Sequence, residues 1–340
     1  MNHPGEENSM KLLLLTAAFV GGLLAATPAM AQNARLGYVP TEDHPVGQAS
    51  RYFAKLVDEK TGGRIKIDTF GNGVLGSEPE MQASVQAGFI DIMVGPTPNL
   101  VGVVPQFMIF DLPFFYKDFA AVDAVMDGAV GEQLFSQLKK KTGIVGLAWW
   151  DNGFRHMTNK IRPINTVEDM AGINIRVIPN PLFIATWKAL GTNPTPLPWP
   201  ELYSALENGA VDAQETPYAL IYTARFYEVQ KYLAKTGHVY TPFVLLASQK
   251  WFGSLSDEDK AIVMDAAKES AAFQRKVSRK SAEDLEQELV AKGFKITQPT
   301  PEALAAMRER VAPVVKEYSE KIGADVVEQA RAAMAAVAGQ

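Results

Sequence analysis

RLGYV at residues 35–39 opens an alternation of short apolar strands and amphipathic helices that decides the fold. VGQASRYFAKLV (46–57) has its apolar residues at helical spacing, and IKI (65–67) alternates with polar residues as a strand does. SEPE (77–80) begins a second helix with the S-x-x-E capping pattern, and FIDIMV (89–94) is an apolar strand. Strand, helix and strand in this order predict an α/β fold with largely parallel sheets.

The same alternation continues toward the carboxyl end. Strands are expected at 143–150 and 173–178, a helix from Asn180-Pro181 to Gly191, and another from Pro200 to Asn208-Gly209. From Ser256 the chain is charged and alanine-rich, which predicts long helices with one strand-like interruption at 294–296. Because no long linker is present, we expect two lobes joined by crossing strands and helices.

The first 31 residues have the features of a cleavable signal peptide. Lys11 precedes the apolar run 12–26, and Ala29-Met30-Ala31 matches an A-x-A cleavage site. The acidic residues before Met10 suit such a leader poorly, so translation starting at Met10 is an alternative. The run is shorter than the roughly 20 residues of a spanning helix, so we expect export to the periplasm without a membrane anchor.

Composition narrows the class of protein. The chain has 340 residues, 47% hydrophobic and 21% charged, with a net charge of −5 that becomes −4 without the leader. A mildly acidic chain argues against a nucleic-acid partner. It has no cysteine, which excludes disulfides, thiolate metal sites and a lipidated cysteine.

One motif suggests an enzyme. GNGVLG (71–76) is a G-x-G-x-x-G between a strand and a helix, with Asp91 about 20 residues downstream, as in dinucleotide-binding folds. However, the helix begins after the third glycine, and Glu78 and Glu80 put negative charge where a pyrophosphate needs a positive helix terminus. We therefore interpret the motif as a glycine-rich turn and keep a periplasmic dinucleotide oxidoreductase as the alternative from another class.

Other catalytic and metal-binding signatures do not occur. The sequence lacks H-E-x-x-H, G-x-S-x-G and a P-loop, and His44, His156 and His238 are scattered. We expect no enzymatic activity, no cofactor and no metal.

Two arginines and one tryptophan are candidates for a binding site. Arg176 lies in INIRV (173–177), where it faces away from its apolar neighbours, and Arg155 follows an apolar strand. A guanidinium matches a carboxylate bidentately, although either arginine could instead form a structural salt bridge. Trp199, between Pro198 and Pro200, could line a ligand pocket or belong to the core.

Several runs occur together, in order, over nearly all of the mature chain. They are LGSE (75–78), GFRH (153–156), DMAG (169–172), IRV (175–177), PTP (194–196), ELYSAL (201–206), GAVDAQE (209–215) and FYEVQKY (226–232). In these runs the chain resembles the DctP-type solute-binding proteins of TRAP transporters.

The resemblance implies a periplasmic binding protein-like fold, with two α/β lobes around a ligand cleft and a long helix that touches both. The lobes would comprise residues 32–152 plus about 241–280, and residues 153–240 plus about 281–340. The cleft would close on a carboxylate.

The resemblance also implies site roles. Arg176 matches the principal carboxylate-binding arginine and Arg155 the second one, Trp199 an aromatic wall, and Glu78 a polar contact to the far end of the ligand. Where many members have Gln-Glu-Asn-Pro this chain has Gln214-Glu215-Thr216-Pro217, so Thr216 offers a shorter hydroxyl in place of an amide. The predicted ligand-binding set is completed by Glu215, Asn152, Asn180 and His44.

The sequence thus predicts a monomeric periplasmic protein that binds a small organic acid anion and delivers it to the membrane subunits of a TRAP transporter. A sugar acid is slightly favoured over a C4-dicarboxylate or an aromatic acid. Gly95-Pro96-Thr97 has no acidic side chain, which disfavours an amino-sugar acid. A binding protein of an ATP-driven importer or of a sensor system remains an alternative.

Overall fold

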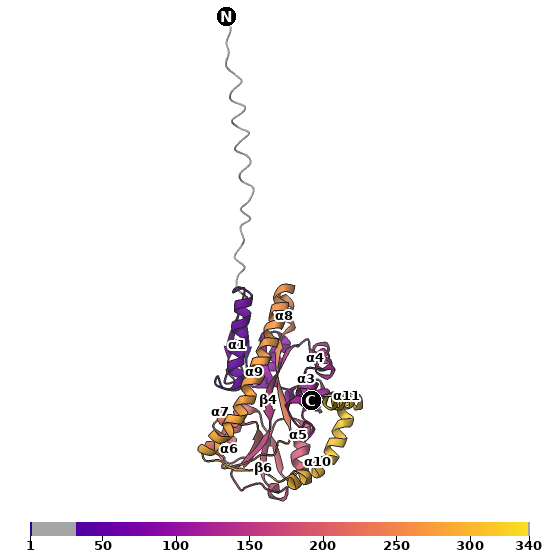
Figure 1. Cartoon of the computed structure of the whole chain (residues 1–340). Helices are drawn as coiled ribbons and strands as arrows, with labels where there is room; N and C mark the ends of the chain where they lie inside the picture. Colours follow the sequence, from indigo (N-terminus) through magenta and orange to yellow (C-terminus); the bar gives the residue numbers. More distant parts are fainter. Residues whose placement is uncertain (2–31, 339–340) are drawn as a thin grey trace.

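The computed structural model describes residues 32–338 together with Met1 (Figure 1). The predicted cleavage site, like nearly all of the predicted leader, lies outside the described residues. The chain folds into two α/β lobes, each built on its own sheet, which confirms the predicted fold class.

The sheet of the first lobe has the strand order β2-β1-β3-β10-β4. Its strands are β1 (Gln32–Gly37), β2 (Ile65–Phe70), β3 (Ile92–Pro96), β4 (Val145–Phe154) and β10 (Tyr240–Ala247). β1 runs parallel to β2 and β3, whereas β10 is antiparallel to both of its neighbours because the chain returns to this sheet from the second lobe. The helices α1 (Pro45–Lys60) and α2 (Glu78–Ala87) form where the sequence predicted them.

The sheet of the second lobe has the order β11-β9-β5-β8-β6-β7. Its strands are β5 (His156–Asn159), β6 (Asn174–Val177), β7 (Asn193–Pro196), β8 (Ala213–Thr216), β9 (Tyr232–Ala234) and β11 (Lys295–Thr297). The sequence did not predict β7, which contains two prolines. β7 is the outer strand beyond β6, a position where a missing N–H is tolerated. The helices of this lobe are α5 (Pro181–Ala189), α6 (Trp199–Glu207) and α7 (Tyr218–Thr223).

Among the described residues, the chain passes three times between the two sheets. β4 ends at Phe154 in the first sheet and β5 starts at His156 in the second, while residues 235–239 lead from β9 to β10. The third connection is α9 (Asp257–Ala291), a helix of 35 residues that follows α8 (Gln249–Ser254). α9 packs against α1 and β4 of the first lobe and against α7 of the second, and Figure 1 shows it running the length of both.

A helical layer covers the other side of the first sheet. It contains α3 (Phe119–Met126), α4 (Ala129–Thr142) and α11 (Ala324–Val337). α10 (Pro301–Ile322) comes directly before α11 in the chain. α11 packs on α3 and α4, and its Val326 and Ala330 are buried in the same cluster as Val122. The lobe boundaries stay a prediction, but these contacts place α11 beside the first lobe, whereas 281–340 was assigned to the second.

Candidate functional site

A cavity between the two lobes brings together most of the predicted site residues. The first lobe contributes Pro40, Glu78, Pro79, Pro96, Asn99, Asn152 and Phe243, and the second lobe contributes Arg176, Ile178, Pro179, Pro198, Trp199, Thr216 and Leu220, with Arg155 at the crossing between them. The empty space, measured out to the open mouth, is about 510 Å³. The mixture of apolar walls with a few polar groups is typical of a small-molecule site.

Arg176 carries a positive charge that has no carboxylate partner among the described residues of the cavity, and its side chain is buried from bulk solvent. It lies on β6 with 2% of its surface accessible, and its Nε donates to the carbonyl of Leu197 at 2.8 Å. Within the described chain, Nη1 is buried without a hydrogen-bond partner and no carboxylate lies within 4.0 Å. Burial lowers the pKa of Arg176 to about 10, so the group stays protonated at neutral pH. An unpaired guanidinium of this kind is suited to bind an anion.

Arg155, in contrast, already has an anionic partner. Its Nε and Nη2 donate to the carboxylate of Glu215 at 2.6 and 2.9 Å, and Nη2 also donates to the Glu215 carbonyl at 2.7 Å. Burial would raise the pKa of Glu215, but Arg155 and a hydrogen bond from His238 at 3.0 Å lower it. Burial lowers the pKa of His238, so this residue is a neutral donor to Glu215. Arg155 therefore brings little net charge to the cavity wall.

Glu78 approaches the cavity from the first lobe. It is the first residue of α2 and is buried, and burial raises its pKa while the opposing charge of Arg176 lowers it by less. The two side chains come from different lobes and, among the described residues, form no ion pair within 4.0 Å. The cavity is thus bordered by a cation on one side and a carboxyl group on the other.

The remaining polar contacts are short side chains. Thr216 ends β8 next to Glu215, and Asn152 lies near the end of β4. Thr216 Oγ1 and Asn152 Oδ1 are both buried and have no hydrogen-bond partner in the part of the chain that the structure covers. With Arg176 Nη1, they form a set of buried polar atoms around one space, as expected where a ligand supplies the missing partners.

Trp199 lines the cavity and also packs on the core. It starts α6, its ring stacks at a tilt on Phe226, and the Arg176 guanidinium carbon lies 5.9 Å from the ring centre. Both readings of this residue from the sequence therefore describe part of its environment. The ring also restricts the Arg176 side chain, because a cation over an aromatic face is attracted to it.

Three predicted site residues lie outside the cavity lining. Glu215 is behind the wall, bound to Arg155. Asn180 caps α5 by accepting from the Leu182 N–H and donates to Asp111 at 2.8 Å. His44 caps α1 by accepting from the Val46 N–H at 3.1 Å, and burial lowers its pKa to about 3. Helix capping explains the positions of Asn180 and His44 without a ligand.

Sequence reasoning missed other members of the site. Asn99, in a short 3-10 helix (Thr97–Leu100), and Phe243 of β10 line the cavity. His238 completes the Arg155–Glu215 pair, and Asp111 is buried beside it with its pKa raised by burial to about 8. Asn99 follows Thr97-Pro98 at the end of a parallel strand, where ligands of α/β proteins commonly bind, and this position could have indicated it.

The glycine motif forms a turn, as interpreted from the sequence. Asn72, Gly73 and Gly76 have positive φ angles of 55°, 66° and 113°, and α2 starts only at Glu78. The first N–H groups of the helix are used internally, because Ser77 and Glu80 form a capping box. A dinucleotide phosphate would have to compete with the Glu80 carboxylate at this terminus.

The two lobes, the crossing segments and the central cavity with its unpaired guanidinium define a solute-binding protein that holds its ligand between hinged domains. Comparison with protein families then identifies the family of solute-binding proteins. Residues 36–321 match the family "Bacterial extracellular solute-binding protein, family 7" (DctP). The chain belongs to this family of TRAP transporter solute-binding proteins, which confirms the resemblance and argues against the importer and enzyme alternatives.

Known relatives cover most of the chain. The sugar acid binding protein DctPAm of Advenella mimigardefordensis, solved with galactonate, is 40% identical, with a TM-score of 0.88 over 91% of this chain and 99% of that one. A TRAP periplasmic solute-binding protein of Polaromonas sp. JS666, solved with D-erythronate, is 36% identical, with a TM-score of 0.85 over 89% and 98%. The 2,3-diketo-L-gulonate-binding periplasmic protein YiaO of Escherichia coli K12 is 36% identical, over 79% of this chain and 82% of the relative.

Proposed function

We propose that this protein binds a hydroxylated monocarboxylate, of the sugar-acid class, in the periplasm and delivers it to the membrane subunits of a TRAP transporter. The carboxylate binds Arg176, with Thr216 and Asn152 as further hydrogen-bond partners. The hydroxylated body extends toward Glu78 and Asn99, and Trp199 and Phe243 pack on its carbon chain.

The observation that carries the proposal is the charge balance of the cavity. Arg176 is unpaired, Arg155 is neutralised by Glu215, and Glu78 adds an acidic group. One ligand carboxylate therefore finds a cation, whereas the second carboxylate of a dicarboxylate would lie in a dry cavity beside Glu78. Placing like charges together in such a cavity is costly, while hydroxyl groups can donate to Glu78 and Asn99.

Three of the relatives support this ligand class, whereas others are named for C4-dicarboxylates or solved with succinate. Galactonate and D-erythronate, present in two related structures, and 2,3-diketo-L-gulonate, named for a third relative, are all hydroxylated monocarboxylates. A shared family and 36 to 40% identity favour a similar binding mode without fixing the length of the sugar chain.

Delivery and location follow from the family and the predicted leader. Residues on both lobes line the cavity, so ligand binding is expected to hold the lobes together, and the closed form would be the one that the membrane subunits recognise. Among the described residues, no helix is both long and apolar enough to cross a membrane. We propose a freely diffusing periplasmic monomer.

A calorimetric panel tests the ligand class. Galactonate and D-erythronate should bind the mature protein, galactitol should fail because it lacks the carboxylate, and succinate should bind at least tenfold more weakly. A bound ligand at 100 times its Kd should also add about 2.7 kcal/mol to the free energy of unfolding. Succinate binding as tightly as the sugar acids would overturn the proposed class.

A further inference from the structure

Asn152 reaches the cavity because β4 carries one extra residue at this point. Gly153 is paired with Thr241 and Asp151 with Pro242, so Asn152 has no partner on β10. A bulge of this kind bends a strand and redirects a side chain, and bulges occur often beside functional sites. The Asn152 side chain accordingly lines the ligand cavity from within a sheet strand.

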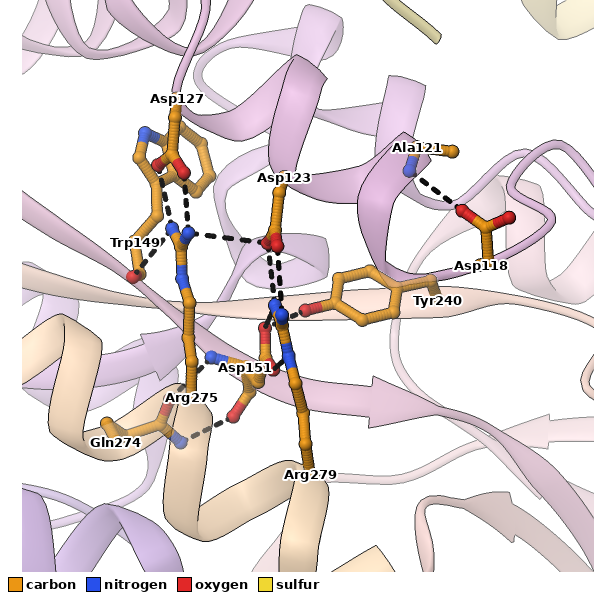
Figure 2. Close-up of polar contacts among 10 residues, drawn as sticks. All are labelled: Asp118, Ala121, Asp123, Asp127, Trp149, Asp151, Tyr240, Gln274, Arg275 and Arg279. Carbon is orange, nitrogen blue, oxygen red and sulfur yellow. Dashed lines mark hydrogen bonds and ion pairs between the residues drawn. The ribbon is translucent and has the colours of Figure 1, made fainter. Parts of the chain in front are cut away.

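The bulge is held from outside the sheet by α9. β4 is the outer strand, so part of its backbone faces away from β10, and α9 packs along this free edge. The Gln274 side chain accepts from the Asp151 N–H and donates to the Asp151 carbonyl, both at 2.7 Å (Figure 2). This one amide thus replaces a neighbouring strand at the residue directly before the bulge. Asp151 is fully buried, so without Gln274 both backbone groups would lose their partner away from water.

The Asp151 side chain is fixed as well. Arg279 donates through Nε to Asp151 Oδ2 at 2.7 Å, the Tyr240 hydroxyl donates to Oδ1, and Asp123 of α3 holds the other side of the Arg279 guanidinium (Figure 2). Arg275, one residue after Gln274, contacts the same strand at the Trp149 carbonyl, at 3.2 Å. α9 therefore contacts Asp151 through two side chains and leaves the bulge little freedom to move.

We infer that Gln274 is a positioning residue for ligand binding, which fixes the bulge that holds Asn152 in the cavity. The inference rests on the proposed function, because it takes Asn152 as a contact of the bound acid. Since α9 packs on both lobes, Gln274 also connects the helix that spans the hinge to one wall of the cavity.

A double-mutant cycle tests the inference with galactonate as the probe. Gln274→Met keeps the length of the side chain but removes both hydrogen bonds, and we expect the Kd to rise at least tenfold. In an Asn152→Ala background, the same substitution should change the Kd less than twofold, because the residue that Gln274 positions is gone. Arg275→Gln is the control on the same stretch of α9. It removes the contact with the Trp149 carbonyl and the ion pairs with Asp123 and Asp127 but makes no direct change at Asp151, and it should leave the Kd within twofold.

A Gln274→Met protein that binds normally, or that loses equal affinity in both backgrounds, would overturn the inference. If Gln274→Met does not fold, Gln274→Glu takes its place with the same expectations, since it still accepts from the Asp151 N–H but cannot donate to the carbonyl. If the unmodified protein binds none of the panel acids, the proposed ligand class fails, and hydrogen exchange decides the structural role of Gln274. Exchange at Asp151 and Asn152 should then rise at least tenfold in Gln274→Met and not in Arg275→Gln, and unchanged protection would refute it.

Discussion

Replacing Arg176 by methionine separates ligand binding from stability. The substitution keeps an unbranched chain in the space beside Trp199 and removes the unpaired charge of the cavity. Without it, a bound carboxylate would lie in a dry site with no cation of its own. By analogy with other buried charged pairs the loss is about 2 to 5 kcal/mol, which corresponds to a roughly 30-fold to several thousand-fold weaker Kd.

The stability of the ligand-free protein should not fall in the Arg176→Met variant, although its affinity for the ligand does. Burial lowers the pKa of Arg176 to about 10, and this shift from the ordinary value corresponds to a folding penalty on the order of 3 kcal/mol at neutral pH. Methionine removes that penalty but also loses the hydrogen bond to the Leu197 carbonyl and the contact with Trp199, together about 1 to 2 kcal/mol. The free energy of unfolding should therefore rise by about 1 to 2 kcal/mol.

Arg155→Met is the control with the same chemistry in the same cavity. It leaves the Glu215 carboxylate fully buried with His238 as its remaining side-chain partner, so the protein should lose about 3 to 5 kcal/mol of stability. Urea denaturation and calorimetry with galactonate measure the two quantities separately. The reasoning fails if Arg176→Met binds galactonate within threefold of the unmodified protein, or if it is destabilised as strongly as Arg155→Met.

Three further predictions concern residues around the cavity. Glu78→Gln should keep galactonate affinity within about fivefold and improve succinate binding at least tenfold, because it replaces an ionisable carboxyl group with a neutral hydrogen-bonding group. An unchanged ratio of the two Kd values in calorimetry would show that Glu78 does not select the ligand. Burial raises the pKa of Asp111 to about 8, whereas the same group in the unfolded chain ionises at about pH 4. Between these two pH values only the folded state keeps the proton, so the free energy of unfolding falls as the pH rises. Asp111→Asn should therefore be more stable than the unmodified protein at pH 8 and equal to it at pH 4 in denaturant titrations, and a gain that is the same at both values would contradict this. His44→Ala should cost about 1 kcal/mol through the lost cap of α1 and leave galactonate affinity unchanged, whereas a weakened Kd would restore His44 to the binding site.

The sequence predicted the parts of the site that depend on strand alternation. Arg176 lies between inward-facing apolar residues of a strand, so a period of two was enough to place it on the opposite face. The position of Trp199 at the start of a helix followed from the prolines around it. The family resemblance supplied the remaining predicted contacts of the cavity, including Glu78 and Thr216.

The features of the site that the sequence did not show depend on contacts between distant segments. The pairing of Arg155 with Glu215 joins residues 60 positions apart, and no local pattern shows that one charge neutralises the other. Asn180 and His44 have side chains that suit either a ligand or a helix terminus, and in the structure each caps a helix. The extra residue at Asn152 is defined only by its register with β10, a strand that comes almost 90 residues later.

The place of β10 also bears on how the chain reaches its final form. β10 lies between β3 and β4, so the first sheet cannot be completed until the polypeptide has been made as far as residue 247 and has passed through the second lobe. Contacts between such distant segments slow folding. The first lobe of a newly synthesised chain therefore stays incomplete until the second lobe has been made.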